Sequence, residues 1–259
     1  MNEDATEVGR PVRFWQLIVP IAGTAAGLLL VAFASGVVIG AITGRPMTEP
    51  EINDYMRDPA IRYIVLQVFL GAIYLVALVA LRWTLGGVGK TQMIADYTPV
   101  QGSWIFLGAV AGVALVITVA VVTGLLAQGG MEFKTGEAER AVMPASVGQL
   151  LMAIATIVIA GPFFEELYFR GALMSWLGGK IGILAAIVVG SVLFALAHGQ
   201  FVMAPGGQGW VATGLLALVG VAASILAWRS RSLWPAFSMH AAFNGTMVAV
   251  AFVAPEMQT

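Results

Sequence analysis

The segment SWIFLGAVAGVALVITVAVVTGLLA, residues 103–127, contains no Asp, Glu, Lys or Arg. An α-helix rises about 1.5 Å per residue, so about 20 apolar residues are enough to cross a hydrocarbon core of roughly 30 Å. The segment therefore predicts one complete transmembrane helix. Gly108 and Gly112 in its first half form a GxxxG pair, a spacing that lets two helix backbones approach closely. We expect this pair to pack within the chain rather than to form a dimer seam.

Comparable apolar stretches recur along the whole chain. The sequence is 59% hydrophobic and only 10% charged, whereas soluble domains are about 25% charged. We expect an all-α fold, a polytopic transmembrane helical bundle of about seven spans with room for an eighth. The seven stretches are residues 14–42, 61–83, 103–127, 147–176, 181–198, 211–228 and 233–253. The Trp residues lie near the ends of these stretches, where indole rings favour the membrane interface: Trp15, Trp83, Trp104, Trp176, Trp210, Trp228 and Trp234.

The polar connections between the stretches are too short to fold as separate soluble domains. We therefore expect one membrane domain overall. Residues 1–146 would supply its N-terminal transmembrane helices, and residues 147–259 would form a core from the last four spans. The sequence shows no internal repeat.

The distribution of Lys and Arg predicts an integral membrane protein with a cytoplasmic N-terminus, because cytoplasmic connections carry an excess of these residues. That side would hold Arg10, Arg13, Arg82, Lys90, Arg170, Lys180, Arg229 and Arg231. The opposite side would hold Arg45, Arg57, Arg62, Lys134 and Arg140. The first group is the larger, which favours this orientation. We expect the protein to reside in a bacterial or archaeal cell membrane.

Composition argues against several classes of partner. The formal net charge of −1 provides no basic surface for a nucleic acid, and zero Cys excludes disulfides and thiolate metal sites. Gly89-Lys90-Thr91 resembles the end of a phosphate-binding P-loop, but the spacing requires a Gly where the chain has Thr84. An apolar span rather than a strand precedes it. We therefore expect no nucleotide. The oligomeric state cannot be read from the sequence.

Ionisable side chains gather late in the chain, in a place where they are unfavourable. Asp, Lys or Arg at the centre of a membrane helix costs about 2.5 to 3.5 kcal/mol, so such residues indicate function. The stretch GPFFEELYFRG, residues 161–171, places two adjacent carboxylates and an arginine in an apolar helix. The only two histidines, His198 and His240, lie in the following spans. Together these residues predict a polar site inside the last four spans.

Helical spacing relates these side chains to one another. Glu166 and Arg170 are four residues apart, so they share a helix face in the favourable order for an ion pair. Glu165 is rotated by about 100° and can face another helix. His240 and Asn244 are also four residues apart and present an imidazole and a carboxamide on one face. An ion pair that serves only helix packing is the alternative interpretation of Glu166 with Arg170.

A carboxylate, two imidazoles and an amide are the groups that hydrolysis of an amide bond requires. Such a reaction needs a base that activates water and donors directed at the developing oxyanion. Zinc is the alternative, because Glu165, His198 and His240 could form a three-ligand site. The chain has no His-Glu-x-x-His helix. We therefore favour a site without a metal or other cofactor, and keep zinc as the alternative.

The sequence resembles the CPBP intramembrane proteases, which include the type 2 CAAX prenyl endopeptidases and the bacterial Abi and bacteriocin-processing proteins. The resemblance covers about residues 147–253 and rests on three motifs, each of which is weak alone. Their order on successive apolar segments is what makes them specific. The three motifs are Glu165-Glu166-x-x-x-Arg170, Phe194-x-x-x-His198 and His240-x-x-x-Asn244.

The resemblance implies specific roles for these residues. Glu165 and His198 would activate the attacking water, and His240 and Asn244 would stabilise the oxyanion. The second acid and the arginine of the first motif would orient the site. The last four spans would then be the catalytic core of an intramembrane endopeptidase, which hydrolyses a peptide bond of a membrane-associated substrate that is prenylated in some members.

Two other functions remain open from the sequence. A non-catalytic immunity or scaffold protein of the same family would use the pocket to bind a partner. A transporter would use the Glu and His residues as a proton relay. Substitution of the site residues distinguishes an enzyme from the first alternative, and flux in liposomes tests the second.

Depth in the membrane adds one geometric expectation. We measure depth along straight helices from the span ends on one membrane side, which are Trp176, Ile181 and Leu233. Glu165 then lies about 16 Å deep, His198 about 26 Å and His240 about 10 Å. Straight, untilted helices would therefore leave His198 about 10 Å too far from the other two. We expect either helix tilt or a connection around Gly178-Gly179 that dips into the membrane.

Overall fold

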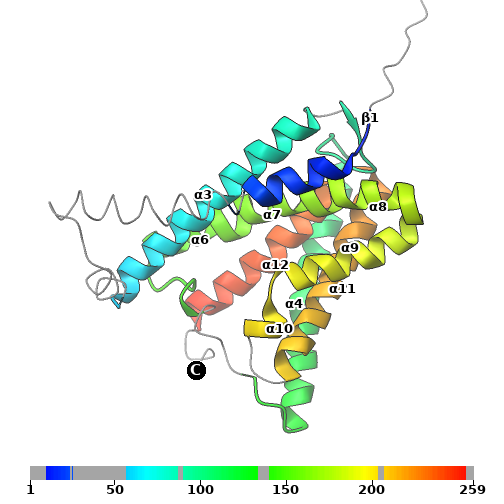
Figure 1. Cartoon of the computed structure of the whole chain (residues 1–259). Coiled ribbons are helices and arrows are strands. Elements are labelled where there is room, and N and C mark those ends of the chain that lie inside the picture. Colours follow the sequence, from blue (N-terminus) through cyan, green and yellow to red (C-terminus); the bar gives the residue numbers. More distant parts are fainter. Residues whose placement is uncertain are drawn as a thin grey trace, which may run out of the picture.

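The computed structural model describes residues 10–23, 25, 57–86, 90–133, 140–203 and 207–254, and these are almost entirely helical (Figure 1). Two of the apolar helices have fewer than 18 residues, Phe14–Gly23 and α9 (Ile183–Ala197). The predicted all-α membrane bundle is confirmed. Among the described residues, five helices are long and apolar enough to cross a membrane: α3 (Pro59–Leu85), α4 (Gly102–Gln128), the continuous helix Val147–Ile181, α11 (Gly207–Ser230) and α12 (Trp234–Val253).

The observed helices follow the predicted stretches closely, with two differences. The first predicted span, residues 14–42, lies largely outside the described residues, which cover only 14–23 and 25 of it. The fifth is short, because the 15 residues of α9 extend about 22 Å, less than the hydrocarbon core. His198 follows α9 directly and is therefore placed by the end of a helix that does not reach across the membrane.

Helix α3 illustrates how local sequence sets the boundaries. Asp58 caps its N-terminus by accepting hydrogen bonds from the backbone N–H groups of Ala60 and Ile61, at 2.8 and 3.2 Å. Pro59 follows the cap, where a missing N–H is harmless. Gly86 ends the helix with a left-handed φ of 73°, the conformation that glycine adopts readily.

The helix Val147–Ile181 is one rod built from two kinds of turn. Seven-residue π-helical segments alternate in it with α-helical ones, and π-helical turns are frequent at functional sites. It also extends beyond the predicted end at residue 176. Its segments are α6 (Val147–Ala153), η1 (Ile154–Ala160), α7 (Gly161–Glu166), η2 (Leu167–Leu173) and α8 (Met174–Ile181).

Pro162 explains the first π-helical segment. A proline has no backbone N–H and interrupts the hydrogen-bond ladder of a helix. The N–H of Gly161 donates to the carbonyl of Thr156, five residues earlier. The carbonyl of Ile157 therefore receives no bond from Gly161, and Pro162 has none to give. This backbone oxygen becomes available to another part of the molecule.

The connection between α8 and α9 differs from the prediction. The helix continues through Gly178 and Gly179 and breaks at Gly182, which has a φ of 80°. The connection therefore lies at Gly182 rather than at Gly178-Gly179, and the choice between a dip into the membrane and helix tilt stays a prediction. Glycine tolerates this left-handed φ without strain, so the chain turns back there, and α9 packs along α8, η2 and α11 (Figure 1).

Helices α4 and α12 form the most extensive helix pair of the structure. A Cβ atom added at Gly108 would lie 2.2 Å from the carbonyl oxygen of Pro235. One added at Gly112 would lie 2.2 Å from the carbonyl oxygen of Met239. Any larger residue would therefore separate the two backbones. The GxxxG pair packs within the chain, as predicted, and it fixes the helix that carries His240.

The connection before α4 fastens one end of the bundle. The backbone N–H of Leu233 donates to the carbonyl of Asp96 at 3.0 Å. Two short strands, β1 (Arg10–Pro11) and β2 (Thr91–Gln92), pair in parallel beside it. Arg10 and Lys90 thus lie together, in keeping with their assignment to one membrane side. The cytoplasmic assignment of that side stays a prediction.

Candidate active site

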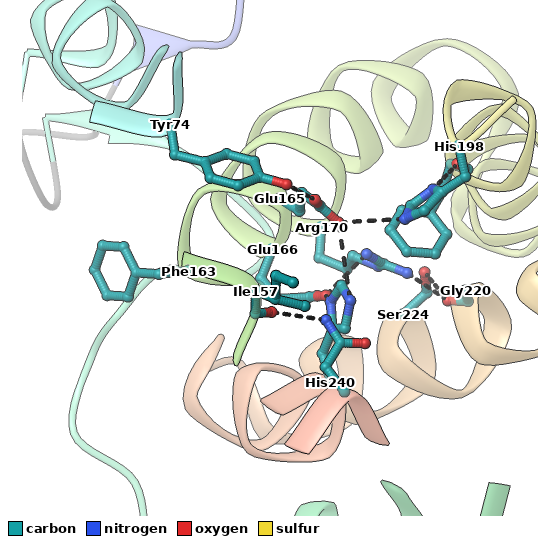
Figure 2. A network of polar contacts seen from close by, with 12 residues as sticks. Tyr74, Ile157, Phe163, Glu165, Glu166, Arg170, His198, Gly220, Ser224 and His240 are labelled. Carbon is teal, nitrogen blue, oxygen red and sulfur yellow. Dashed lines mark hydrogen bonds and ion pairs between the residues drawn. The ribbon is translucent and has the colours of Figure 1, made fainter. Parts of the chain in front are cut away.

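Glu165 and Glu166 are neighbours on α7, but their side chains enter different surroundings (Figure 2). Successive helix residues are rotated by about 100°. None of the Glu166 side chain is exposed, whereas 15% of the Glu165 side chain is. The two carboxylates therefore differ in burial, although His240 approaches both of them.

Glu166 joins two of the predicted residues through one oxygen. Its Oε1 atom accepts a hydrogen bond from Arg170 Nη1 at 2.9 Å. His240 Nδ1 lies 2.9 Å from the same oxygen. A carboxylate oxygen accepts hydrogen bonds, so Nδ1 of His240 carries a proton and donates it. The predicted Glu166–Arg170 pair is present, and it also holds His240, a contact that the sequence did not indicate.

Arg170 is buried within the bundle, with 1% of its side chain exposed. Its Nη2 atom donates to the carbonyl of Gly220 on α11 at 3.3 Å. Its guanidinium carbon lies 4.2 Å from the ring centroid of Phe194, the geometry of a cation–π contact. Arg170 is therefore not at the membrane surface, where the distribution of Lys and Arg predicted it.

Gly220 and Ser191 bring α11 and α9 into close contact. A Cβ atom added at Gly220 would lie 2.9 Å from Cβ of Ser191. This approach lets the Gly220 carbonyl reach Arg170. It also sets the position of α9, which carries Phe194 and leads into His198. The Phe194 ring contacts the rings of both His198 and His240, at 4.5 and 5.7 Å between centroids.

His198 and His240 direct the same ring atom at the same carboxylate oxygen. His198 Nδ1 lies 2.9 Å from the carbonyl oxygen of Phe194. A carbonyl only accepts, so this nitrogen donates. His198 Nε2 then lies 3.7 Å from Glu165 Oε2, and His240 Nε2 lies 3.8 Å from it (Figure 2). Such separations are too long for direct hydrogen bonds, but one water oxygen can bond both ends.

The structure thus brings together five of the six predicted polar residues. The depth gap expected for His198 is closed, because α9 ends at the level of Glu165. The five residues come from α7, η2, the end of α9 and α12. Their convergence makes this the strongest candidate site in the described part of the chain.

Asn244 is the sixth predicted residue, and its amide has a different partner. Asn244 Nδ2 donates to the carbonyl of Ile157 at 2.9 Å. This carbonyl is the one that Pro162 and the π-helical turn leave without a helical donor. One N–H of the carboxamide is therefore occupied by the backbone of η1, and the second has no hydrogen-bond acceptor among the described residues. The sequence predicted the shared face with His240 but not this anchor.

Two tyrosines contact the site region without having been predicted. Tyr74 on α3 donates from its hydroxyl to Glu165 Oε1 at 3.4 Å (Figure 2). Tyr97, in the connection before α4, donates to the carbonyl of Phe163 at 2.8 Å and stacks on the Phe163 ring at 4.2 Å. Burial raises the pKa of Tyr97, and the charge of Glu166 adds to the effect, so its hydroxyl remains a donor. A tyrosine within an apolar span was the available signal for Tyr74.

The described residues contain no group of three or more His, Cys, Asp or Glu side chains placed to hold a metal ion. The candidate zinc ligands are nevertheless the residues that converge on Glu165 Oε2. The Glu166 carboxylate is held by Arg170 and His240. The preference for a site without a metal, with zinc as the alternative, stays a prediction.

Comparison with known proteins gives one result. Residues 147–246 match the family described as type II CAAX prenyl endopeptidase Rce1-like. No curated protein and no solved structure matches the chain. The matched residues begin at α6 and end in α12, and they include all three motifs. Residues 147–246 therefore form a domain of the type II CAAX prenyl endopeptidase Rce1-like family, and the resemblance to the CPBP intramembrane proteases is confirmed.

Proposed function

We propose that this protein is an intramembrane endopeptidase that hydrolyses a peptide bond of a membrane-associated substrate by an activated water. The observation that carries the proposal is the approach of two imidazole Nε2 atoms, of His198 and His240, to Glu165 Oε2 at 3.7 and 3.8 Å. A base must lie within hydrogen-bond reach of the proton that it takes, directly or through one water. A water bonded to Glu165 Oε2 would meet this requirement.

The hydrogen bonds that the two rings already make suit His198 and His240 to different tasks. His198 donates from Nδ1 to the Phe194 carbonyl, so the neutral ring offers a lone pair at Nε2. Water can then donate one hydrogen to Glu165 and one to His198, which leaves an oxygen lone pair for the carbonyl carbon of the substrate. Glu165 takes one proton of this water as the new C–O bond forms. It returns the proton to the leaving amine as the C–N bond breaks.

His240 is suited to the oxyanion. Because its Nδ1–H is donated to Glu166, it can donate from Nε2 only as an imidazolium. Ionised Glu165 and Glu166, together with Arg170 and this imidazolium, form a set without net charge, which suits burial in a membrane. The free N–H of Asn244 would be the second donor to the developing negative charge.

The first substrate to test follows from the family description, which names a CAAX prenyl endopeptidase. A prenyl chain would hold a peptide at the membrane, where the site lies. We therefore propose a membrane-associated peptide or protein as the substrate, and a prenylated CAAX peptide as the first probe. The same peptide without its prenyl group is the matched control.

The decisive experiment compares cells that express the wild-type chain with cells that express Glu165→Gln. Glutamine has nearly the shape of glutamate but cannot take the proton from water. Proteomic analysis should find new protein termini in wild-type cells that are missing with the variant, at equal amounts of membrane-inserted protein. Identical termini in both, with identical turnover of the prenylated probe, would remove the protease assignment in favour of a non-catalytic family member.

A further inference from the structure

Helix α3 lies outside the matched residues 147–246, yet it supplies a side chain to the candidate site. Tyr74 approaches Glu165 from the side opposite His198 (Figure 2). Its hydroxyl donates to Glu165 Oε1 at 3.4 Å, across 91 residues of sequence. This is long for an O–H···O bond, as hydrogen bonds in ligand-free active sites often are. We infer that Tyr74 is a positioning residue, which holds one carboxylate oxygen of Glu165 so that the other faces both histidines.

A glutamate carboxylate needs such an anchor. Its last side-chain torsion is broad and roughly two-fold, so the two oxygens readily change places. Glu165 Oε2 has no hydrogen-bond partner within the described residues, although two imidazoles face it. Glu165 Oε1 has Tyr74. The tyrosine therefore distinguishes the two oxygens and keeps the second directed at the position of the attacking water.

The Tyr74 ring is itself held against the acid-bearing helix. A Cβ atom added at Gly161, one turn before Glu165, would lie 3.0 Å from Cζ and 3.1 Å from the hydroxyl oxygen of Tyr74. The ring thus rests on the backbone of α7. Its centroid lies 6.3 Å from that of Phe164. Glycine at 161 leaves the room that the hydroxyl needs to reach the carboxylate.

The partner of Tyr74 differs from those of the other tyrosines that the structure describes. Tyr63, Tyr97 and Tyr168 all donate to backbone carbonyls, of Gln149, Phe163 and Leu17. Those bonds tie segments together. Among these four tyrosines, only Tyr74 donates to an ionisable side chain, and that side chain is the proposed base. The inference therefore rests on the proposed function.

The test compares Tyr74→Phe with Tyr63→Phe. Both variants remove one hydroxyl from α3 and keep the ring, but the Tyr63 hydroxyl bonds the Gln149 carbonyl at 2.7 Å. Turnover of the prenylated CAAX peptide is measured with purified protein in detergent or liposomes. Tyr74→Phe should lower kcat about tenfold and leave KM within about twofold, because it disturbs the base and not substrate binding. Tyr63→Phe should change neither constant.

A second readout does not need proteolysis. Hydrophobic carbodiimides modify carboxyl groups in apolar surroundings, and the Tyr74 hydroxyl occupies one oxygen of Glu165. Mass spectrometry of the peptide that contains Glu165 should therefore show faster labelling in Tyr74→Phe than in wild type and Tyr63→Phe. Gly161→Ala, which displaces the ring, should act in the same direction as Tyr74→Phe.

The outcomes separate the inference from the proposed function. Wild-type kcat and wild-type labelling in Tyr74→Phe would overturn the inference, and so would equal losses in both tyrosine variants. A wild-type protein that does not cleave the peptide, combined with faster labelling in Tyr74→Phe alone, would count against the proposed function and support the placement of Glu165 by Tyr74.

Discussion

The two carboxylates of α7 lie about 100° apart around one helix axis, and they differ in burial and in most of their partners. On the Glu166 side, Arg170 and His240 share one oxygen of a side chain that is 0% exposed. On the Glu165 side, one oxygen meets Tyr74, and the other faces two imidazole nitrogens at distances that water can bridge. Identical residue types thus obtain different uses. The difference fits the proposed roles, with Glu166 as a support and Glu165 as the base.

The largest effect should come from the Glu165 side. Glu165→Gln and His198→Ala should each lower turnover by about 10⁴-fold, because both remove groups that activate water. The melting temperature and membrane insertion should stay at wild-type values, since neither change opens the buried ion pair. Kinetic assays with the prenylated peptide and thermal unfolding in detergent provide the measurement. A Glu165→Gln protein with wild-type turnover would show that Glu165 is not the base.

The Glu166 side should respond in stability as well as in activity. Arg170→Ala leaves a buried carboxylate without its counter-charge, which should lower the free energy of unfolding by about 3 to 5 kcal/mol. Arg229→Ala is the matched control, because Arg229 is exposed on α11, and its loss should change stability by about 1 kcal/mol or less. Thermal unfolding of both variants is compared with the wild type. An inactive Arg170→Ala protein that melts normally would move Arg170 to the reactive side.

A smaller loss is expected at the anchor between η1 and α12. Asn244→Ala should slow turnover by roughly 10²- to 10³-fold, the usual effect of removing one oxyanion donor. Pro162→Ala supplies a backbone N–H that competes for the Ile157 carbonyl, so it should lower turnover in the same direction by a smaller factor. Pro235→Ala is the control, because Pro235 lies in the first turn of α12, where its missing N–H frees no carbonyl. Equal activity of the Pro162 and Pro235 variants would separate Asn244 from the π-helical turn.

No effect is expected from removing metal ions. Water activation by Glu165 and His198 uses groups that the chain itself supplies, and Glu166 is held by Arg170 and His240. Purified protein should keep its turnover after exhaustive chelation and contain less than one zinc per chain by elemental analysis. Activity that is lost on chelation and restored by zinc would convert Glu165, His198 and His240 into ligands, and both sides of α7 would then support a metal centre.

Much of the fold was predictable because a membrane allows few backbone conformations. Every backbone group inside the bilayer must be bonded, so a long apolar stretch becomes a helix, and the predicted 103–127 is observed as α4, Gly102–Gln128. The failures are local. Gly178-Gly179 looked like a break, yet the helix continues to Ile181, because glycine in a helix is only about 1 kcal/mol less favourable than alanine. The break occurs at Gly182, whose φ is positive.

Within the site, the sequence by itself determined the pairs that helical periodicity creates. Glu166 with Arg170, and His240 with Asn244, are four residues apart, and a helix places such residues on one face whatever surrounds it. The identity of the acids, the histidines and the amide was likewise readable, because polar residues are conspicuous in apolar spans.

Tertiary structure alone decided which helices meet. The His240–Glu166 contact joins residues 74 apart, and the Tyr74–Glu165 contact joins residues 91 apart. No local period relates such positions. They depend on close helix approaches, such as that of Gly220 to Ser191, and on a carbonyl that Pro162 releases. The difference between the two carboxylates of α7 arises from these packing contacts, and for that reason the sequence showed a pair of acids where the structure shows a support and a candidate base.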